Sequence, residues 1–478
     1  MGSRCICEEN ERAPQNLSTA KKASSSELPY SRCPRTPKGG WAKSNDIGMN
    51  RVYLQNKTLA MKLPALLALS LLAAPLMHAA NTDLAASAVN QLGVDLHHRL
   101  AKSDANLCLS PLSIQIALAM TYAGADGETA AEMAKTLHYP KDNEPAVRES
   151  FQALVKGLDE ARAKSQERAS HSKQYGGPSE PIVFNLANRL FGQKGYAFRA
   201  PYLSELKDGY HSPFEELDFK TNTEASRKHI NGWVEEETKK RIKDLIPSGA
   251  LSPVTRLVLA NALYLKAPWE KEFNDRATKP EPFHIHGKEP AEVPTMIQKA
   301  YYGYATENGY TAVTLPYSGG DLQFIILLPE KQTGLHDLEA KLTSAELAKC
   351  AKLEPREVIL YLPKFKLESP SIALGEQLSA LGMKTAFDQP RGSANFDKIA
   401  PRKPDDYLFI SEVFHKTFIA VDEHGTEAAA ATAVIMAAGS AFRPAQPPEI
   451  HVDHPFLFAI QHVPSGACLF IGRVTDPR

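Results

Sequence analysis

The sequence contains little cysteine: six residues in a chain of 478. Three of them precede residue 61, and the other three are Cys108, Cys350 and Cys468. An odd, widely spaced set is not the framework of a disulfide-rich fold, although a single bridge stays open as an alternative. Cys108 and Cys468 lie in apolar, strand-like sequence, so we expect them to be buried core thiols.

Motifs of enzymes and metal sites are missing after residue 80. That part of the sequence has no Gly-x-Ser-x-Gly elbow, His-Glu-x-x-His pair, Walker loop or Cys-x-x-Cys pair. His284 and His286 would share one face of a strand, but no further ligands accompany them. We interpret the two as a polar strand edge, and we expect no metal, no cofactor and no enzymatic activity.

Charge of one sign is not in excess, because 55 basic residues balance 55 acidic ones. This balance argues against a global attraction to nucleic acid or an anionic surface, so we expect no nucleic-acid partner. Basic residues within 156–168 are interleaved with acidic ones, which is typical of a solvated helix face rather than a polyanion site.

The first 80 residues differ from the rest. Residues 1–60 are rich in Ser, Lys, Pro and Asn and lack periodic apolar residues, so we expect disorder or a start codon assigned too early. Residues 61–80 have a basic start, a short apolar run and a small-residue end, which resembles a bacterial secretory signal peptide. Cleavage after Ala79 or Ala80 would leave 81–478 as one domain, exported to the periplasm or outside the cell, without a membrane anchor.

Residues 423–440 stand out for small side chains and for lacking charge after Glu427. They have neither a helical stripe nor strong strand propensity. Read as a strand, the run alternates, so that 426–436 would present an uncharged face while Glu427 lies on the other. Gly425 stands where a backbone hinge needs the least restricted residue. An alanine-rich linker or a helix is the alternative.

This run resembles the reactive-centre loop of the serpins, a family of serine protease inhibitors, in its Glu-x-Gly-Thr-Glu-Ala-Ala-Ala-Ala-Thr-Ala hinge. Further similarities lie in Ser-Pro-Leu-Ser-Ile at 110–114, in the Gly, Thr and Met pattern of 124–133, and in 450–460. Together they cover roughly 85–478. The resemblance implies an α+β fold: one domain with a large mixed sheet A, smaller sheets B and C, eight or nine helices, and an exposed reactive-centre loop over 423–448.

The resemblance also implies roles for particular residues. The hinge, which inserts into sheet A in this family, is Glu423, Gly425, Thr426, Glu427, Ala428, Ala429, Ala430 and Ala431. The shutter, a polar cluster under the centre of that sheet, is Ser110, Ser113, Asn261 and His415. The breach, at the end of the sheet where the hinge enters, contains Trp269.

An irreversible suicide-substrate inhibitor of serine proteases is the function that the resemblance implies. In this family the target protease cuts the loop, the hinge inserts into sheet A as a new strand, and the protease stays bound as the acyl-enzyme, a process for which serpins are the usual example. Family spacing counted from Glu423 places the cut at Gly439–Ser440, with Ala438–Gly439 as the alternative. The small residues before the cut indicate an elastase-like or subtilisin-like protease.

A non-inhibitory serpin, acting as a binding or chaperone-like protein, is the alternative function. Hinges of such members commonly carry bulky, charged or proline residues, whereas this hinge has four alanines. We expect a monomer whose partner is the target protease in a covalent complex, with loop–sheet polymers as a hazard of an open sheet.

Periodicity predicts several elements directly. Residues 85–100 and 230–246 have apolar residues at helical spacing, and 230–246 resembles the serpin helix that crosses sheet A. Residues 257–265 are apolar on both faces, so we expect a central strand there. Asn261 interrupts that strand and, once buried, needs hydrogen-bond partners.

Overall fold

The computed structural model describes residues 70–141, 143–174, 180–285, 288–307, 309–427 and 446–478. All described residues lie in one compact unit, Ala65–Arg478. These residues form nine α-helices, in agreement with the expected number: α1 (Ser70–Leu100), α2 (Pro111–Tyr122), α3 (Gly127–Thr136), α4 (Glu144–Lys173), α5 (Ala200–Ser204), α6 (Phe219–Glu237), α7 (Leu335–Lys341), α8 (Ser344–Cys350) and α9 (Gly375–Leu381).

A seven-stranded mixed sheet corresponds to the expected sheet A. Its order is β10-β12-β13-β4-β2-β3, and β11 also pairs with β12. The β12–β4 and β2–β3 pairs are parallel and the others are antiparallel. Its strands are β2 (Val183–Gln193), β3 (Glu215–Leu217), β4 (Leu257–Pro268), β10 (Phe365–Glu368), β11 (Ile372–Ala373), β12 (Val413–Asp422) and β13 (Gly425–Thr426).

In place of the two smaller sheets expected, B and C, the described residues form one nine-stranded sheet, ordered β1-β16-β15-β8-β7-β6-β9-β14 with β5 on β6. The two expected sheets are joined because β6 is long enough to pair with β5 and β9 in its earlier part and with β7 in its later part. The strands are β1 (Leu107–Leu109), β5 (Lys279–Phe283), β6 (Ala291–Glu307), β7 (Tyr310–Pro316), β8 (Leu322–Pro329), β9 (Pro355–Pro363), β14 (Glu449–His451), β15 (Phe456–His462) and β16 (Ala467–Val474).

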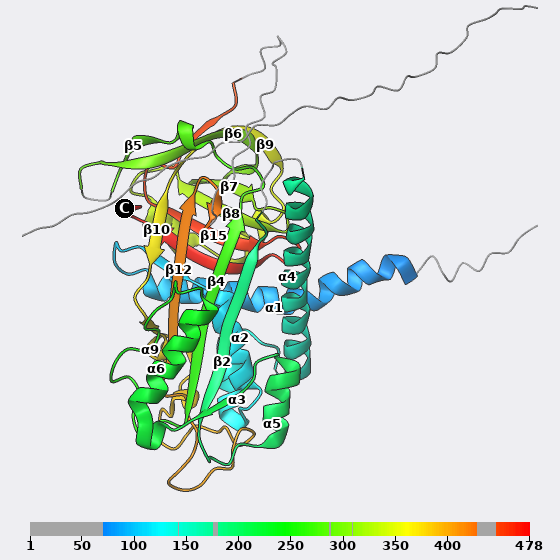
Figure 1. Ribbon diagram of the computed structural model, residues 1–478, viewed down its shortest axis with the longest axis vertical. Coiled ribbons are helices and arrows are strands. Elements are labelled where there is room, and N and C mark those ends of the chain that lie inside the picture. The colour runs from blue at the N-terminus through cyan, green and yellow to red at the C-terminus, as the bar shows by residue number, and fades with distance from the viewer. Residues whose placement is uncertain (1–69, 142, 175–179, 286–287, 308, 428–445) are drawn as a thin grey trace, which may run out of the picture. The chain divides into compact units, whose positions relative to one another are not determined.

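Sheet A is covered on both faces. Helix α6 lies on the face toward the viewer and packs against β2 and β4, and α2 packs against the same two strands (Figure 1). Alternate residues of β4 therefore enter different cores: Leu259 and Leu263 join the large core, whereas Ala260 joins a smaller cluster with Ile230 and Val234 of α6. This double burial explains why β4 is apolar on both faces, as its sequence predicted.

The helix predicted over 230–246 ends at Glu237 in the structure. Lys239 and Lys240 have left-handed backbone conformations, which do not continue a helix. The Thr238 hydroxyl donates to Val234 O (2.7 Å) and accepts from the Ile242 amide (3.1 Å), which closes the helix end. The segment 238–246 nevertheless buries Ile242, Leu245 and Ile246 against sheet A, as the helical spacing had suggested.

Helix α1 begins before the expected residue 85, at Ser70, and runs across the expected cleavage point. The signal peptide and the export of residues 81–478 stay predictions. Among the described residues, no helix is both long and apolar enough to cross a membrane. Cys108, Cys350 and Cys468 are buried and free, and burial raises the pKa of Cys108 and Cys350 to about 12.

Candidate functional site

The start of the hinge is already paired inside sheet A. Asp422 Oδ1 accepts hydrogen bonds from the amides of His424 (2.9 Å) and Gly425 (3.3 Å), which turns the chain at the end of β12. Strand β13 then runs antiparallel to both neighbours, with Thr426 opposite Val421 of β12 and Ala267 of β4. Hinge residues Ala428, Ala429, Ala430 and Ala431, and Ala438, Gly439 and Ser440 at the expected cut, lie outside the described residues.

Gly425 is required by its surroundings. Its φ of +151° is a conformation that side chains rarely adopt, and a Cβ there would stand 2.2 Å from the carbonyl oxygen of Ala267. Only glycine therefore fits between β12 and β4 at this turn.

Glu423 fixes the turn from its other side. Its carboxylate pairs with Lys364 (2.6 Å) and accepts a hydrogen bond from the Thr278 hydroxyl (2.7 Å). Burial favours the neutral acid, but these two partners outweigh burial and lower the pKa of Glu423. The Glu423 carbonyl also accepts from the Phe273 amide (2.8 Å), so the turn is held by backbone and side chain together.

Trp269 is buried directly beside the docked hinge. Its indole N–H donates to Asp422 O (2.9 Å), and its amide donates to His424 O (2.9 Å). The indole stacks on Tyr317 with ring centroids 4.7 Å apart, and the Tyr317 hydroxyl lies 2.5 Å from Thr426 Oγ1. Thr426 is thus buried on the inner face of sheet A, and Trp269 contacts the hinge through both the turn and Tyr317.

Glu427 points to the opposite face, toward the segment that follows α6. Its carboxylate pairs with the Arg241 guanidinium, and its amide donates to Ala420 O (2.9 Å). Burial raises the pKa of Glu427 despite the attraction of Arg241. The alternation expected for the run is therefore present in its first two residues, Thr426 inward and Glu427 outward.

Beyond the hinge, β12 and β4 pair directly with each other. Their parallel register runs from Val413 opposite Leu259 to Thr417 opposite Leu263. Further along, the two strands separate and β13 lies between them. The two central strands of sheet A are therefore in direct contact over 413–417 and 259–263, and they are separated by β13 near Trp269.

The four predicted shutter residues lie together where β12 and β4 are in direct contact. The Ser110 amide donates to His415 Nε2 (3.0 Å), so Nε2 must be unprotonated and Nδ1 carries the hydrogen that Asn261 Oδ1 accepts (2.8 Å). The Asn261 amide group donates to Ser113 O. Complete burial lowers the pKa of His415 to about 3, so the imidazole is neutral.

Asn188 is a fifth member of this cluster, and the sequence did not identify it. It stands opposite Asn261 in the β2–β4 register. Its Oδ1 accepts from Ser113 Oγ (3.0 Å) and Asn261 Nδ2 (3.1 Å), and its Nδ2 donates to Ser113 O (3.2 Å). A cavity of about 540 Å³ adjoins Asn188 between α4 and β2.

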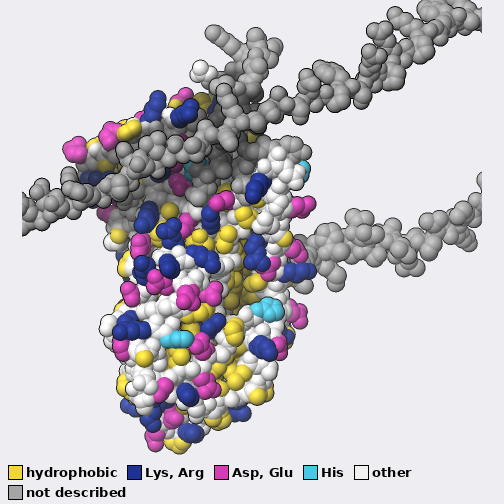
Figure 2. Space-filling view, viewed as in Figure 1, with side chains coloured by type: hydrophobic (Ala, Val, Ile, Leu, Met, Phe, Trp, Pro, Cys, Tyr) yellow, Lys and Arg dark blue, Asp and Glu magenta, His cyan; other side chains and the backbone are white. Residues whose placement is uncertain are grey.

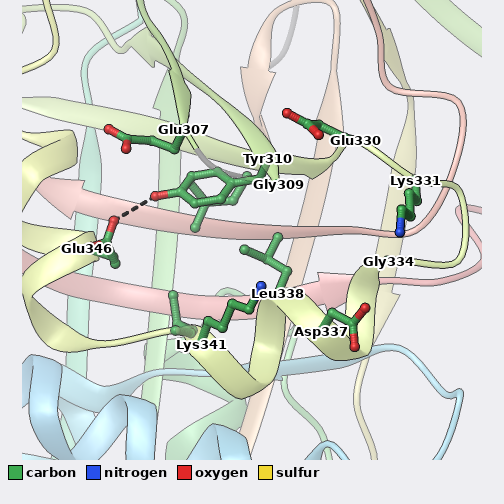
Figure 3. Close-up of a pocket in the computed structure, with 12 residues that line it drawn as sticks. Glu307, Gly309, Tyr310, Glu330, Lys331, Gly334, Asp337, Leu338, Lys341 and Glu346 are labelled. Carbon is green, nitrogen blue, oxygen red and sulfur yellow. Dashed lines mark hydrogen bonds between the residues drawn. The ribbon is translucent and has the colours of Figure 1, made fainter.

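A separate cavity of about 510 Å³ lies between the β6–β8 strands and helices α7 and α8 (Figure 3). The Tyr310 hydroxyl donates to Glu346 (2.7 Å) across it, and its other charged lining residues include Glu307, Glu330 and Lys341. No Ser, Cys or His lines it, so the described residues offer no nucleophile–base pair there. Nor do they contain a cluster of metal-ligating side chains.

Cationic and anionic side chains are interspersed on the face that carries α6, β4 and β12 (Figure 2). The four Lys and Arg residues of α4 within 156–168 each pair with a carboxylate, which agrees with a solvated helix face. The pairs are Lys156–Glu160, Arg162–Asp159, Lys164–Asp321 and Arg168–Glu270.

Comparisons with known proteins point to the same family as the hinge and shutter. A profile described as "Serpin (serine protease inhibitor)" matches residues 87–477. The chain is 38% identical over 404 residues to a leukocyte elastase inhibitor from Bos taurus, covering 82% of this chain and 99% of that protein. It is 37% identical over 395 residues to a serpin-like protein from Thermococcus kodakarensis, covering 82% and 85% of the two chains.

Solved structures show the same fold. The thermophilic serpin tengpin in its native state matches with a TM-score of 0.70 and 27% identity, over 82% of this chain and 93% of that chain. Uncleaved ovalbumin matches with a TM-score of 0.67 and 27% identity, over 82% of this chain and 99% of that chain.

Proposed function

Because the chain belongs to the serpin family, we propose that it is an irreversible suicide-substrate inhibitor of an elastase-like or subtilisin-like serine protease. The observation that carries this proposal is the docked hinge: β13 already occupies the first position of an additional strand between β12 and β4. A loop that begins as an inserted strand can continue as one when its far end is released.

The proposed reaction uses the protease's own chemistry. The protease serine hydroxyl attacks the carbonyl carbon of Gly439, the Gly439–Ser440 amide bond breaks, and Ser440 leaves with a new amino group. Gly439 is then held as an ester on the protease. Insertion of the freed strand must outrun attack of water on that ester, and it forms backbone hydrogen bonds along two strand edges.

The register of β13 predicts where insertion becomes costly. In the proposed inserted strand, the same register carried past Glu427 would put Ala428 and Ala429 where β12 and β4 have separated. It would put Ala430 opposite Thr417 and Leu263, the first directly paired residues. From Ala430 onward, each inserted residue must replace a β12–β4 contact. Small side chains suit a strand that enters between packed neighbours.

The target class follows from the residues before the cut. Alanine and glycine at 437–439 fit a narrow, apolar specificity pocket, whereas a deep acidic pocket would select Lys or Arg. The leukocyte elastase inhibitors among the relatives support the same class. We further propose that the protein acts outside the cytoplasm after removal of residues 61–80, and that Trp269 and the shutter residues control opening of sheet A.

The test is to mix residues 81–478 with an elastase, separate the products on a denaturing gel, and identify the released peptide by mass spectrometry. A stable band at the summed mass, with a peptide that begins at Ser440, is expected. A peptide beginning at Gly439 would select the alternative bond. Cleavage without an adduct by elastase-, subtilisin-, trypsin- and chymotrypsin-like enzymes would favour a non-inhibitory binding protein instead.

A further inference from the structure

We propose that Arg241 is a positioning residue that holds the hinge docked in sheet A before any protease arrives, by supplying the counter-charge that Glu427 needs. The role rests on the proposed function, because docking matters there as the first step of insertion. Arg241 belongs neither to the hinge nor to the shutter. It reaches the hinge from the segment 238–246, more than 180 residues earlier in the chain.

The Glu427 carboxylate lies in a largely buried position. Its side chain is only 10% exposed, and its Oε2 atom has no hydrogen-bond partner among the described residues. A buried carboxylate without a counter-ion is costly, so it takes up a proton or leaves the site. Burial does raise the pKa of Glu427 in this structure, even with Arg241 in place.

Arg241 is the cation placed to compensate that carboxylate. Its Nε donates to Glu427 Oε1, and its guanidinium also lies 5.4 Å from the centroid of the Phe418 ring on β12. Two other cations near Glu427 are engaged elsewhere, since Lys266 pairs with Glu180 and Lys366 lies 3.7 Å from Glu368.

The segment that presents Arg241 is fixed on both sides of it. Ile242 follows directly and is buried, with its amide bonded to Thr238 Oγ1 (3.1 Å). Ile246 exchanges two hydrogen bonds with the Asn231 side chain of α6 (2.8 and 2.9 Å). Arg241 therefore meets Glu427 from a rigid element, so the pair ties the hinge to the structure that covers sheet A.

The turn at 422–425 has its own hydrogen bonds, but few contacts hold the residues after it. Strand β13 has two residues, and past Gly425 the other hydrogen bonds are from the Glu427 amide to Ala420 O and between Thr426 and Tyr317. Without Arg241, we expect the charged Glu427 to pull the hinge out of the sheet. Neutralising Glu427 at the same time should restore docking, because the backbone bonds do not need the charge.

Hydrogen exchange at the Glu427 amide measures docking directly, since that amide is bonded only while the hinge is in the sheet. With the full chain, Arg241→Ala should raise its exchange rate by roughly tenfold or more, and Arg241→Ala/Glu427→Gln should return it toward the original rate. Arg241→Lys should restore part of the protection. Lys243→Ala, an exposed cation of the same segment, is the matched control and should change nothing.

Unchanged protection in Arg241→Ala would overturn the proposal, and so would a double variant as unprotected as the single one. Protection of the Thr417 region, where β12 and β4 pair, separates hinge release from general loosening. In a second readout, Arg241→Ala should consume more inhibitor per protease trapped than the original chain. If the original chain forms no adduct, the proposed function fails, while the exchange result still decides the role of Arg241.

Discussion

His415 on β12 and Asn261 on β4 stand opposite each other in the parallel register, joined by a 2.8 Å hydrogen bond from Nδ1 to Oδ1. This bond joins β12 to β4, the two strands that would separate in the proposed insertion. In the proposed inserted strand, the register of β13 carried past Glu427 would put Thr432 between these two residues. The bond therefore stabilises the closed sheet, and insertion must replace it with equivalent hydrogen bonds.

Asn261→Ala should destabilise the closed protein. It would leave His415 Nδ1 and part of the Asn188 amide without partners in a fully buried site, at a cost of about 1–3 kcal/mol. Urea unfolding of the uncleaved protein measures the loss. Asn185→Ala is the control, because Asn185 is only half-buried and donates to Glu237 O at the sheet surface. Equal losses of unfolding free energy in both variants would show that the buried shutter cluster contributes no more to stability than the half-buried Asn185 does.

The free energy of unfolding should decrease as the pH is lowered below about 6.5, because of His415. The folded protein keeps this side chain neutral down to its pKa of about 3, whereas the unfolded chain binds the proton near pH 6.5. Between these values the unfolded state holds more protons, so the contribution is complete above pH 6.5 and decreases by about 1.4 kcal/mol per pH unit on acidification. His415→Gln should flatten the pH dependence of urea unfolding over this window.

His462 provides the comparison for that experiment. Burial lowers its pKa to about 4, so His462→Gln should also flatten the profile, but only between about pH 6.5 and 4. A profile that keeps its full slope below pH 4 in His415→Gln would contradict the assignment to His415.

Much of the fold could be predicted from local sequence. The double apolar faces of β4 and the alternation from Thr426 to Glu427 follow from strand geometry, and the structure has both. The end of α6 was predicted wrongly, at residue 246 instead of Glu237. Apolar spacing continues past that point, while the left-handed Lys239 and Lys240 leave no signal in a periodicity argument.

Part of the candidate site could also be predicted from the sequence. Family motifs indicated four shutter residues, and the structure brings them together. Asn188 was missed because, in the sequence, it looks like an ordinary polar residue of an amphipathic strand. Only its register with Asn261 shows that two buried amides face each other. Arg241 could not be found either, because nothing local to residues 238–246 points to a carboxylate so far along the chain.

Gly425→Ala should undock the hinge without unfolding the domain. The new Cβ would meet the Ala267 carbonyl oxygen at 2.2 Å, a backbone atom that cannot rotate away. We expect faster exchange of the Glu427 amide and a higher ratio of inhibitor consumed to protease trapped. Gly232→Ala on α6 is the control, because a Cβ there meets nothing within 4 Å and alanine favours helix. Normal docking in Gly425→Ala would mean that the turn relaxes around the methyl group.

Ala430→Asp should convert the inhibitor into a substrate. The register places residue 430 opposite Thr417 and Leu263, and its parity with Thr426 turns its side chain toward the inner face of sheet A. A carboxylate there would have to be buried unpaired, so insertion slows and water releases the protease. Gels with active-site-titrated elastase should show cleaved loop in place of adduct, whereas Ala430→Ser keeps most of the trapping. One-to-one trapping by Ala430→Asp would place the end of insertion before residue 430.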